Sequence, residues 1–495
     1  MIKVSIPNFP NVEKTILFGI DGVHYELPAN VELITQTEWT KKSLLEEISR
    51  ASAGFDLIYF AWADCPLLDP ALAGTLAERH LRYAAEYSYA DGWPYGLSPE
   101  ILTPGTAGIL AKIVGDDDGP VDRDALFSVI QKDINAFDIE TEISPADLRH
   151  FRISLTTESA RNRLLLSRLA DACVKSASEV ESFIKENPEL LRTLPAFFNI
   201  QVTTACPQAC SYCPWPTHGG DIPLGERKDF MAKADFFALL DKIADFAGDA
   251  VISLSLWGEL ALHPEKIALV EAVLARPALS LLIETSGIGW KTEELKTLAQ
   301  TAQQAAPRLN HQAPLSWIVS LDAQDPERYN TIRGAGYAEA KACAKTLFEL
   351  FPNDTYVQAV RFKGSEDDIE QFYRSWKNNP DLQKRKDGSF IIVQKYDDFA
   401  GTLPKLQASD LSPVTRRPCW HIQRDMNILL DGRVPCCRED LAALKGNGNK
   451  PIWGNAFTEK LAAIWERGND VYREHCALEY KGICANCDEY YTYNF

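Results

Sequence analysis

The segment from about residue 195 to 396 alternates short apolar runs with longer amphipathic runs. The short runs have the length and composition of buried strands, and the longer runs have helical periodicity. The six predicted strands lie at 197–204, 250–257, 279–286, 315–322, 355–362 and 389–396. Strands that alternate with helices predict an α/β fold with a parallel sheet and helices outside it. Six strands are too few for a closed eight-stranded barrel, so we expect an open, partial (β/α)6 barrel of the TIM type.

Three cysteines, Cys206, Cys210 and Cys213, directly follow the first predicted strand. Sites in folds of this kind lie at the carboxyl ends of the strands, which is where this loop falls. Three thiolates on one loop can hold a cubane iron–sulfur cluster and leave one of its four irons without a protein ligand. That open iron can chelate a substrate. The alternative is a zinc site, which normally needs four closed ligands, with His218 as the fourth.

Charge and cysteine usage narrow the function classes. The chain has 495 residues and a net charge of -18, which disfavours binding to nucleic acid or anionic membranes, because both need a basic surface. The sequence shows no signal peptide and no apolar run of the ~20 residues that a membrane span needs, so a cytoplasmic location is expected. Most of the 12 cysteines form two clusters, which in a cytosolic protein indicates metal ligands. Cys65, Cys173 and Cys343 stand apart and are predicted to be buried small hydrophobes.

The spacing C-x3-C-x-aromatic-C, with Tyr212 as the aromatic residue, resembles the signature of the radical S-adenosylmethionine (SAM) superfamily. The resemblance implies a 4Fe-4S cluster whose fourth iron binds the amino and carboxylate groups of SAM. An electron from the cluster splits SAM and yields a 5'-deoxyadenosyl radical, which abstracts a substrate hydrogen. A reductant such as flavodoxin or ferredoxin is an implied partner.

Three further segments resemble SAM-binding positions of the same family. They are "SLWGELALHP", which departs from the family's G-G-E-P at Trp257 and Leu260, "IETSGIGW", and "VSLDAQDPERYNTIRG". The resemblance implies that Gly258 and Glu259 contact the SAM amino group, and that Thr285, Ser286 and Gly287 lie near SAM. It also implies that Ser320 and Asp322 bind the ribose hydroxyls, and that Arg333 binds the SAM carboxylate. It assigns no catalytic acid or base.

The C-terminal region carries the second cysteine cluster, in "RPCWHIQRDMNILLDGRVPCCREDL" and "CANC". Within it, "MNILLDGRVPCC" predicts a hairpin around the turn Asp431-Gly432. The pattern resembles the SPASM and twitch domains, which carry auxiliary iron–sulfur clusters in radical SAM enzymes. The resemblance implies one auxiliary 4Fe-4S cluster held by Cys419, Cys437, Cys484 and Cys487. Cys436 is expected on the opposite face as a small hydrophobe and Cys476 is spare, while a structural four-cysteine zinc site is the alternative.

The N-terminal region is of a different kind. Residues 54–81, "GFDLIYFAWADCPLLDPALAGTLAERHL", predict a strand, an acidic turn and a helix, and resemble the nucleotidyltransferase (glycosyltransferase A-like) fold. In active members the aspartate of this turn, here Asp64, binds magnesium. The start of the region, residues 16–30, lacks the basic, glycine-rich loop that a triphosphate needs. We therefore expect a degenerate domain, used for recognition or assembly.

The whole chain resembles the group called spiro-SPASM proteins. The expected boundaries are a nucleotidyltransferase-like domain at 1–175, a helical linker at 176–194, a radical SAM partial barrel at 195–400 and a twitch/SPASM-like domain at 401–495. The expected function is radical modification of a peptide or protein side chain, as in many auxiliary-cluster relatives. The alternatives are a sugar- or nucleotide-linked small molecule as substrate, or a non-catalytic iron–sulfur or zinc protein that carries electrons or scaffolds a partner.

Overall fold

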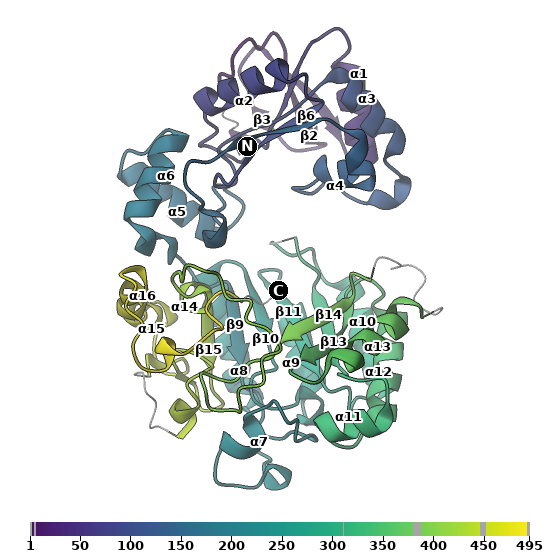
Figure 1. Cartoon of the computed structure of the whole chain (residues 1–495), viewed down its shortest axis with the longest axis vertical. Helices are drawn as coiled ribbons and strands as arrows, with labels where there is room; N and C mark the ends of the chain where they lie inside the picture. The colour runs from purple at the N-terminus through teal and green to yellow at the C-terminus, as the bar shows by residue number, and fades with distance from the viewer. Residues whose placement is uncertain (1, 4–5, 310, 380–387, 446–451, 493–495) are drawn as a thin grey trace. The chain divides into compact units, whose positions relative to one another are not determined.

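The structure is a computed structural model that describes residues 2–3, 6–309, 311–379, 388–445 and 452–492. The chain divides into two compact units, which we call unit 1 (residues 1–158 and 162–191) and unit 2 (residues 159–161 and 192–495). Figure 1 draws unit 1 from purple to blue and unit 2 from teal to yellow. In the described ranges no helix is long and apolar enough to cross a membrane.

Unit 2 is built on seven parallel strands in the order β14-β13-β12-β11-β10-β9-β15. The strands are β9 (Phe197–Ile200), β10 (Ala250–Ser253), β11 (Leu279–Thr285), β12 (Leu315–Ser320), β13 (Thr355–Arg361), β14 (Ile391–Lys395) and β15 (Asp425–Ile428). Six of them are the strands predicted from the apolar runs, and their parallel pairing confirms the predicted α/β fold. Parallel strands are covered on both faces, which is why these runs are almost continuously apolar.

The helices that connect the strands pack their apolar stripes on one face of this sheet (Figure 1). They are α8 (Lys233–Ala247), α9 (Lys266–Leu274), α10 (Thr292–Gln304), α11 (Pro326–Arg333), α12 (Tyr337–Leu350) and α13 (Glu366–Lys377). The opposite face carries a smaller apolar layer made by Phe197, Val251, Leu282 and Ile318. Since strand side chains alternate between faces, polar residues two positions further along each strand lie on this second face, near the carboxyl ends.

The segment predicted as a hairpin has a different architecture. The turn is present: Leu429 N donates to Arg433 O (2.8 Å), and Gly432 adopts a positive φ of 82°. The two arms do not pair with each other. β15 instead pairs in parallel with β9, and β16 (Arg433–Val434) pairs with β17 (Gly454–Asn455). The hairpin prediction is therefore wrong in its pairing, because β15, whose four residues are all buried, gains more burial at the open edge of the large sheet than in an isolated two-stranded ribbon.

The three isolated cysteines do not share one environment. Cys65 and Cys343 are buried, as predicted for small hydrophobes. Cys173 is exposed, so its prediction is wrong. It follows the end of α5 (Ala160–Asp171) with a positive φ of 58°, and this reversal turns the neighbouring Val174 into the core in its place.

Unit 1 is also α/β. A four-stranded mixed sheet has the order β5-β7-β6-β8, and two parallel strands, β2 and β4, pair separately. The elements are β1 (Ile2–Lys3), β2 (Thr15–Ile20), β3 (Tyr25–Glu26), β4 (Val31–Gln36), α1 (Lys41–Ala51), β5 (Ile58–Phe60), α2 (Pro70–Arg82), β6 (Tyr87–Asp91), β7 (Glu100–Leu102), α3 (Pro104–Ile113), α4 (Phe127–Ile130), β8 (Ile139–Ile143) and α6 (Ala177–Glu186). The turn with Asp64 lies between β5 and α2, as the sequence predicts for that strand, turn and helix.

Candidate functional site

The three clustered thiols of unit 2 lie on the loop that follows β9. Cys206, Cys210 and Cys213 are each half-buried, and Cys213 N donates to Cys210 O (3.1 Å). Burial, with smaller contributions from Glu259 and the nearby Cys210 thiol, raises the pKa of Cys206 to about 12. Burial also raises the pKa of Cys213, with Cys210 and Cys206 adding to the effect. The three thiols thus form one electrostatic group, and a bound metal cluster would supply the positive charge that their ionisation needs.

Hydrogen bonds join this loop to helix α11. Ser211 N donates to Ile332 O (2.8 Å), and Gln208 Nε2 donates to the Tyr329 hydroxyl (2.8 Å), both on α11. Trp215, on the short helix α7 (Trp215–His218), donates its indole N–H back to Thr204 O (3.1 Å). The cysteines are therefore held by contacts with residues more than 100 positions away, so that a metal would meet a preorganised donor set.

Arg333, Asp322 and Tyr212 form a buried group beside the cysteine loop. Arg333 Nη1 lies 2.7 Å from Asp322 Oδ2 and also bonds the Tyr212 hydroxyl, which in turn donates to Asp322 Oδ2 (2.7 Å). Burial opposes the charge on Arg333, but Cys210, Tyr212 and Asp322 outweigh it and hold its pKa well above the ordinary value. The charge of Arg333 is thus coupled directly to the thiol of Cys210.

Glu259 is a second buried charge near the thiols. Its carboxylate accepts from Thr285 Oγ1, Ser286 Oγ and Ser286 N, each at 2.7 Å, and from Ala261 N (3.2 Å). Burial raises its pKa, and the hydrogen bonds from Ser286 and Thr285 oppose that rise. Thr285 and Ser286 therefore orient Glu259. Their predicted closeness to SAM stays a prediction.

Gly258 brings this carboxylate against the cysteine loop. It has a φ of 157°, and a Cβ added here would lie 2.2 Å from Thr203 O. The next residue, Glu259, donates its N–H to Ala205 O (2.8 Å), directly before Cys206. Only glycine permits this approach, so the departure from the family's segment at Trp257 leaves the contact between the two loops intact.

A carboxylate that the sequence analysis missed lies on the second face of the sheet. Glu284 on β11 is exposed, and its Oε1 accepts from Gln358 Nε2 (2.8 Å) and from Ser320 Oγ (3.4 Å). Its backbone N–H donates to Ser255 Oγ (2.8 Å). Ser320, which the family resemblance assigns to a ribose hydroxyl of SAM, thus contacts Glu284. The available signal was the alternation, which places position 284 on the face opposite to Ile283 and Thr285.

The second cysteine cluster is gathered from distant positions. Burial raises the pKa of Cys419 to about 12, and Cys484 adds to the effect. Burial, then Glu439, Cys419 and Cys487 raise the pKa of Cys437 well above its usual range. Cys419 thus lies near Cys484 and Cys437, and Cys437 lies near Cys487, which links the four predicted ligands in one neighbourhood. Cys436 is buried within the large apolar core, which agrees with its prediction as a small hydrophobe.

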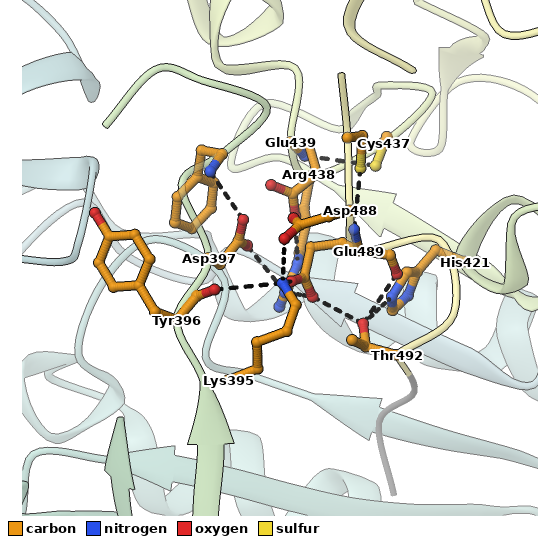
Figure 2. A network of polar contacts seen from close by, with 12 residues as sticks. Lys395, Tyr396, Asp397, His421, Cys437, Arg438, Glu439, Asp488, Glu489 and Thr492 are labelled. Carbon is orange, nitrogen blue, oxygen red and sulfur yellow. Dashed lines mark hydrogen bonds and ion pairs between the residues drawn. The ribbon is translucent and has the colours of Figure 1, made fainter. Parts of the chain in front are cut away.

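Charged residues surround two of these thiols (Figure 2). Glu439 N donates to Cys437 Sγ (3.5 Å), and Glu489 N donates to Cys487 Sγ (3.4 Å). Lys395 at the end of β14 bonds Asp488 (3.0 Å) and Glu489, so it ties the sheet to the cysteine-bearing tail. N–H bonds to sulfur stabilise thiolates and tune the reduction potential of a cluster that they hold.

In unit 1, Asp64 is already bound by an internal cation. Arg123 holds it in a fork, with Nη1 to Oδ1 at 2.8 Å and Nη2 to Oδ2 at 2.6 Å. Arg123 also contacts Glu158 (3.1 Å) and lies over the ring of Trp62, with 4.7 Å between the guanidinium carbon and the ring centroid. A bidentate pair of this kind occupies both carboxylate oxygens.

Comparison with known proteins assigns the family. The radical SAM superfamily model matches residues 200–375, which contain the cysteine loop, Glu259, Asp322 and Arg333. An uncharacterised protein of Treponema pallidum (strain Nichols) is 37% identical over 379 residues, covering 75% of this chain and 98% of the relative. The chain belongs to the radical SAM superfamily and is an enzyme, which sets aside the carrier or scaffold alternative. Membership implies a 4Fe-4S cluster, SAM and a reductant, and it displaces zinc and His218 at the first cluster.

Two solved structures are similar at low identity. SuiB of Streptococcus suis bound to the precursor peptide SuiA is 14% identical, with a TM-score of 0.43 and coverage of 74% of this chain and 83% of that chain. BtrN in complex with AdoMet and 2-DOIA is 16% identical, with a TM-score of 0.38 and coverage of 60% and 94%.

Proposed function

We propose that this radical SAM enzyme modifies a peptide or protein side chain. The observation that carries its chemistry is the single electrostatic group that Cys210 forms with Arg333, Asp322 and Glu259, three charges from the two segments that follow β10 and β12. When bound, the cluster and SAM supply a 5'-deoxyadenosyl radical for hydrogen abstraction. The peptide class is supported by the resemblance of the second cysteine cluster to SPASM and twitch domains.

The residues of unit 2 fit the groups that they are proposed to hold. Cys206, Cys210 and Cys213 are the three ligands of the first cluster, and their half-buried loop limits access of water. Glu259 is the acceptor for the SAM ammonium, because Thr285 and Ser286 fix a carboxylate that would otherwise be costly to bury. Arg333 provides the positive charge for the SAM carboxylate, Ser320 and Asp322 serve the ribose, and Gly258 and Tyr212 complete the pocket.

Glu284 is proposed to face the substrate. It is the exposed carboxylate on the sheet face that also carries Ser320 and Gln358, and its two side-chain donors fix its direction. Peptide substrates offer N–H donors that such a carboxylate can accept. This supports a polar substrate over a purely apolar one.

Cys419, Cys437, Cys484 and Cys487 are proposed to hold one closed auxiliary 4Fe-4S cluster. Four thiolates satisfy every iron, which suits electron transfer or structure more than substrate binding. The bonds from Glu439 N and Glu489 N to sulfur would offset part of the negative charge that a bound cluster requires at two of the four positions.

Unit 1 is proposed to be a degenerate nucleotidyltransferase-like domain. The fork from Arg123 to Asp64 supports the degeneracy, because the carboxylate that active members use for magnesium is already neutralised. We expect no release of pyrophosphate from any nucleoside triphosphate. Turnover in a malachite-green assay with pyrophosphatase, lost in Asp64→Ala, would contradict this proposal.

The test of the proposed function is reductive cleavage of SAM. Anaerobically reconstituted protein is incubated with dithionite and SAM, and 5'-deoxyadenosine is measured by chromatography and mass spectrometry. We expect product from the wild type and from Cys173→Ala, a matched control at an exposed cysteine. The variant Cys206→Ala/Cys210→Ala/Cys213→Ala should form none. Cleavage by the triple variant at the wild-type rate would overturn the assignment.

A further inference from the structure

Unit 1 contains a cavity of about 260 Å³ that the proposed radical chemistry does not use. It lies at the carboxyl end of β5, between the segment 87–100 and the segment 123–127. Seven aromatic residues line it: Phe60, Trp62, Tyr87, Tyr89, Trp93, Tyr95 and Phe127. The volume is slightly below the ~300–1,000 Å³ of pockets for drug-sized ligands, so it suits one side chain rather than a nucleotide.

The charges in this cavity favour a cation. Glu100 is partly buried in its wall and accepts from the Tyr87 hydroxyl. Burial, opposed by the hydrogen bond from Tyr87 and assisted by the charge of Asp124, raises the pKa of Glu100 to about 7. Asp124 adds a second, exposed carboxylate. Among the lining residues Arg123 is the single positive charge, and Asp64 and Glu158 already neutralise it.

The aromatic walls also favour a cation. Aromatic faces attract an ammonium or guanidinium group, and Arg123 already lies over the rings of Trp62 and Tyr95. The aliphatic stem of a lysine or arginine side chain packs against apolar surface while its charged head meets a carboxylate. The volume fits one such side chain, which a peptide segment can present.

We propose that this cavity binds a lysine or arginine side chain of a peptide segment. The cationic head lies between the aromatic rings and meets the carboxylates of Glu100 and Asp124. A phosphate group is a poor occupant, since the one guanidinium in the wall is already paired. The proposal depends on unit 1 alone, so its failure leaves the radical chemistry of unit 2 untouched.

The test is isothermal titration calorimetry with full-length, cluster-loaded protein and three tripeptides. The probe is Ac-Gly-Lys-Gly-NH2, the matched control Ac-Gly-Nle-Gly-NH2 keeps the aliphatic chain without the charge, and Ac-Gly-Glu-Gly-NH2 reverses the charge. We expect the norleucine peptide to bind at least tenfold more weakly than the lysine peptide and the glutamate peptide to bind more weakly still. Equal affinity for the lysine and norleucine peptides would overturn the proposal. So would binding of glucose or UTP by a protein that does not bind the lysine peptide.

Two substitutions separate a ligand role from a structural one. Glu100→Gln keeps the shape of the side chain and its bond to Tyr87 but removes the charge. It should lower the affinity for the lysine peptide at least tenfold. Glu186→Gln, at an exposed carboxylate at the end of α6, should leave the affinity unchanged. Circular dichroism and the rate of SAM cleavage should be unchanged in both variants. Full affinity in folded Glu100→Gln would contradict the role of this carboxylate.

Discussion

The two cysteine clusters of this enzyme are assembled in opposite ways. The first set, Cys206, Cys210 and Cys213, lies within eight residues of one loop, and charges from two other segments, those after β10 and β12, are brought to it. The second set is gathered from positions 419 to 487, and only its last two members are close in sequence. As proposed, three thiols would leave an iron open to SAM, and four thiols would close an auxiliary cluster. The number of thiols decides the proposed role, and the way they are gathered decides how much folded structure each cluster needs.

We expect the largest effect when the three thiols of the first cluster are removed. Cys206→Ala/Cys210→Ala/Cys213→Ala should reduce the iron content from about eight to about four per chain, because one of two cubanes is lost. Iron is measured by a colorimetric assay after anaerobic reconstitution. Retention of all eight irons would show that these thiols hold no cluster, whatever the SAM assay shows.

The charge beside the first cluster gives the next largest effect. Glu259→Gln removes a carboxylate held by four donors and should weaken SAM binding roughly 10- to 150-fold, since hydrogen bonds to charged groups contribute ~1.5–3 kcal/mol. The dissociation constant is measured by equilibrium dialysis. Glu265→Gln, an exposed glutamate six residues later, is the control. Unchanged affinity in Glu259→Gln would exclude this carboxylate as the acceptor for the SAM ammonium.

Loss of the second cluster is expected to lower the iron content without stopping SAM cleavage. Cys437→Ala should reduce iron from about eight to about four per chain and leave the cleavage of SAM to 5'-deoxyadenosine intact, because the first cluster does not depend on it. The neighbouring Cys436→Ala should keep all of the iron, since this side chain lies in the apolar core. Loss of iron in Cys436→Ala and not in Cys437→Ala would reverse the ligand assignment.

The smallest expected effect concerns the contact between two loops of the first site. In Gly258→Ala the new Cβ meets Thr203 O at 2.2 Å, so the variant should lose about 1–3 kcal/mol of unfolding free energy. Urea denaturation measures this loss. Gly225→Ala is the control, because its Cβ would enter open space. Equal midpoints for the two variants would show that the loops do not need this close approach.

Much of the fold was predictable because its signals are local. The apolar runs and helical repeats of 195–396 predicted six strands in the order of the chain, and β9 to β14 confirm them. The seventh strand was misplaced. β15 is only four residues long, and its partner β9 lies more than 220 positions earlier, so no local pattern could separate an edge strand from a hairpin arm.

The features of the candidate site likewise separate into those that the sequence predicts and those that only the folded structure shows. The sequence by itself determined the cysteine spacing, the strand after which it falls and the acidic and basic residues that resemble SAM contacts, because each depends on neighbours in the chain. Tertiary structure alone decided that Arg333 pairs with Asp322 and Tyr212, that Glu284 faces Ser320 and Gln358, and that Arg123 occupies Asp64. The physical reason is that a charged side chain takes whichever partner the folded chain brings within hydrogen-bond distance, most strictly where it is buried, and that partner is set by the tertiary arrangement rather than by adjacent residues.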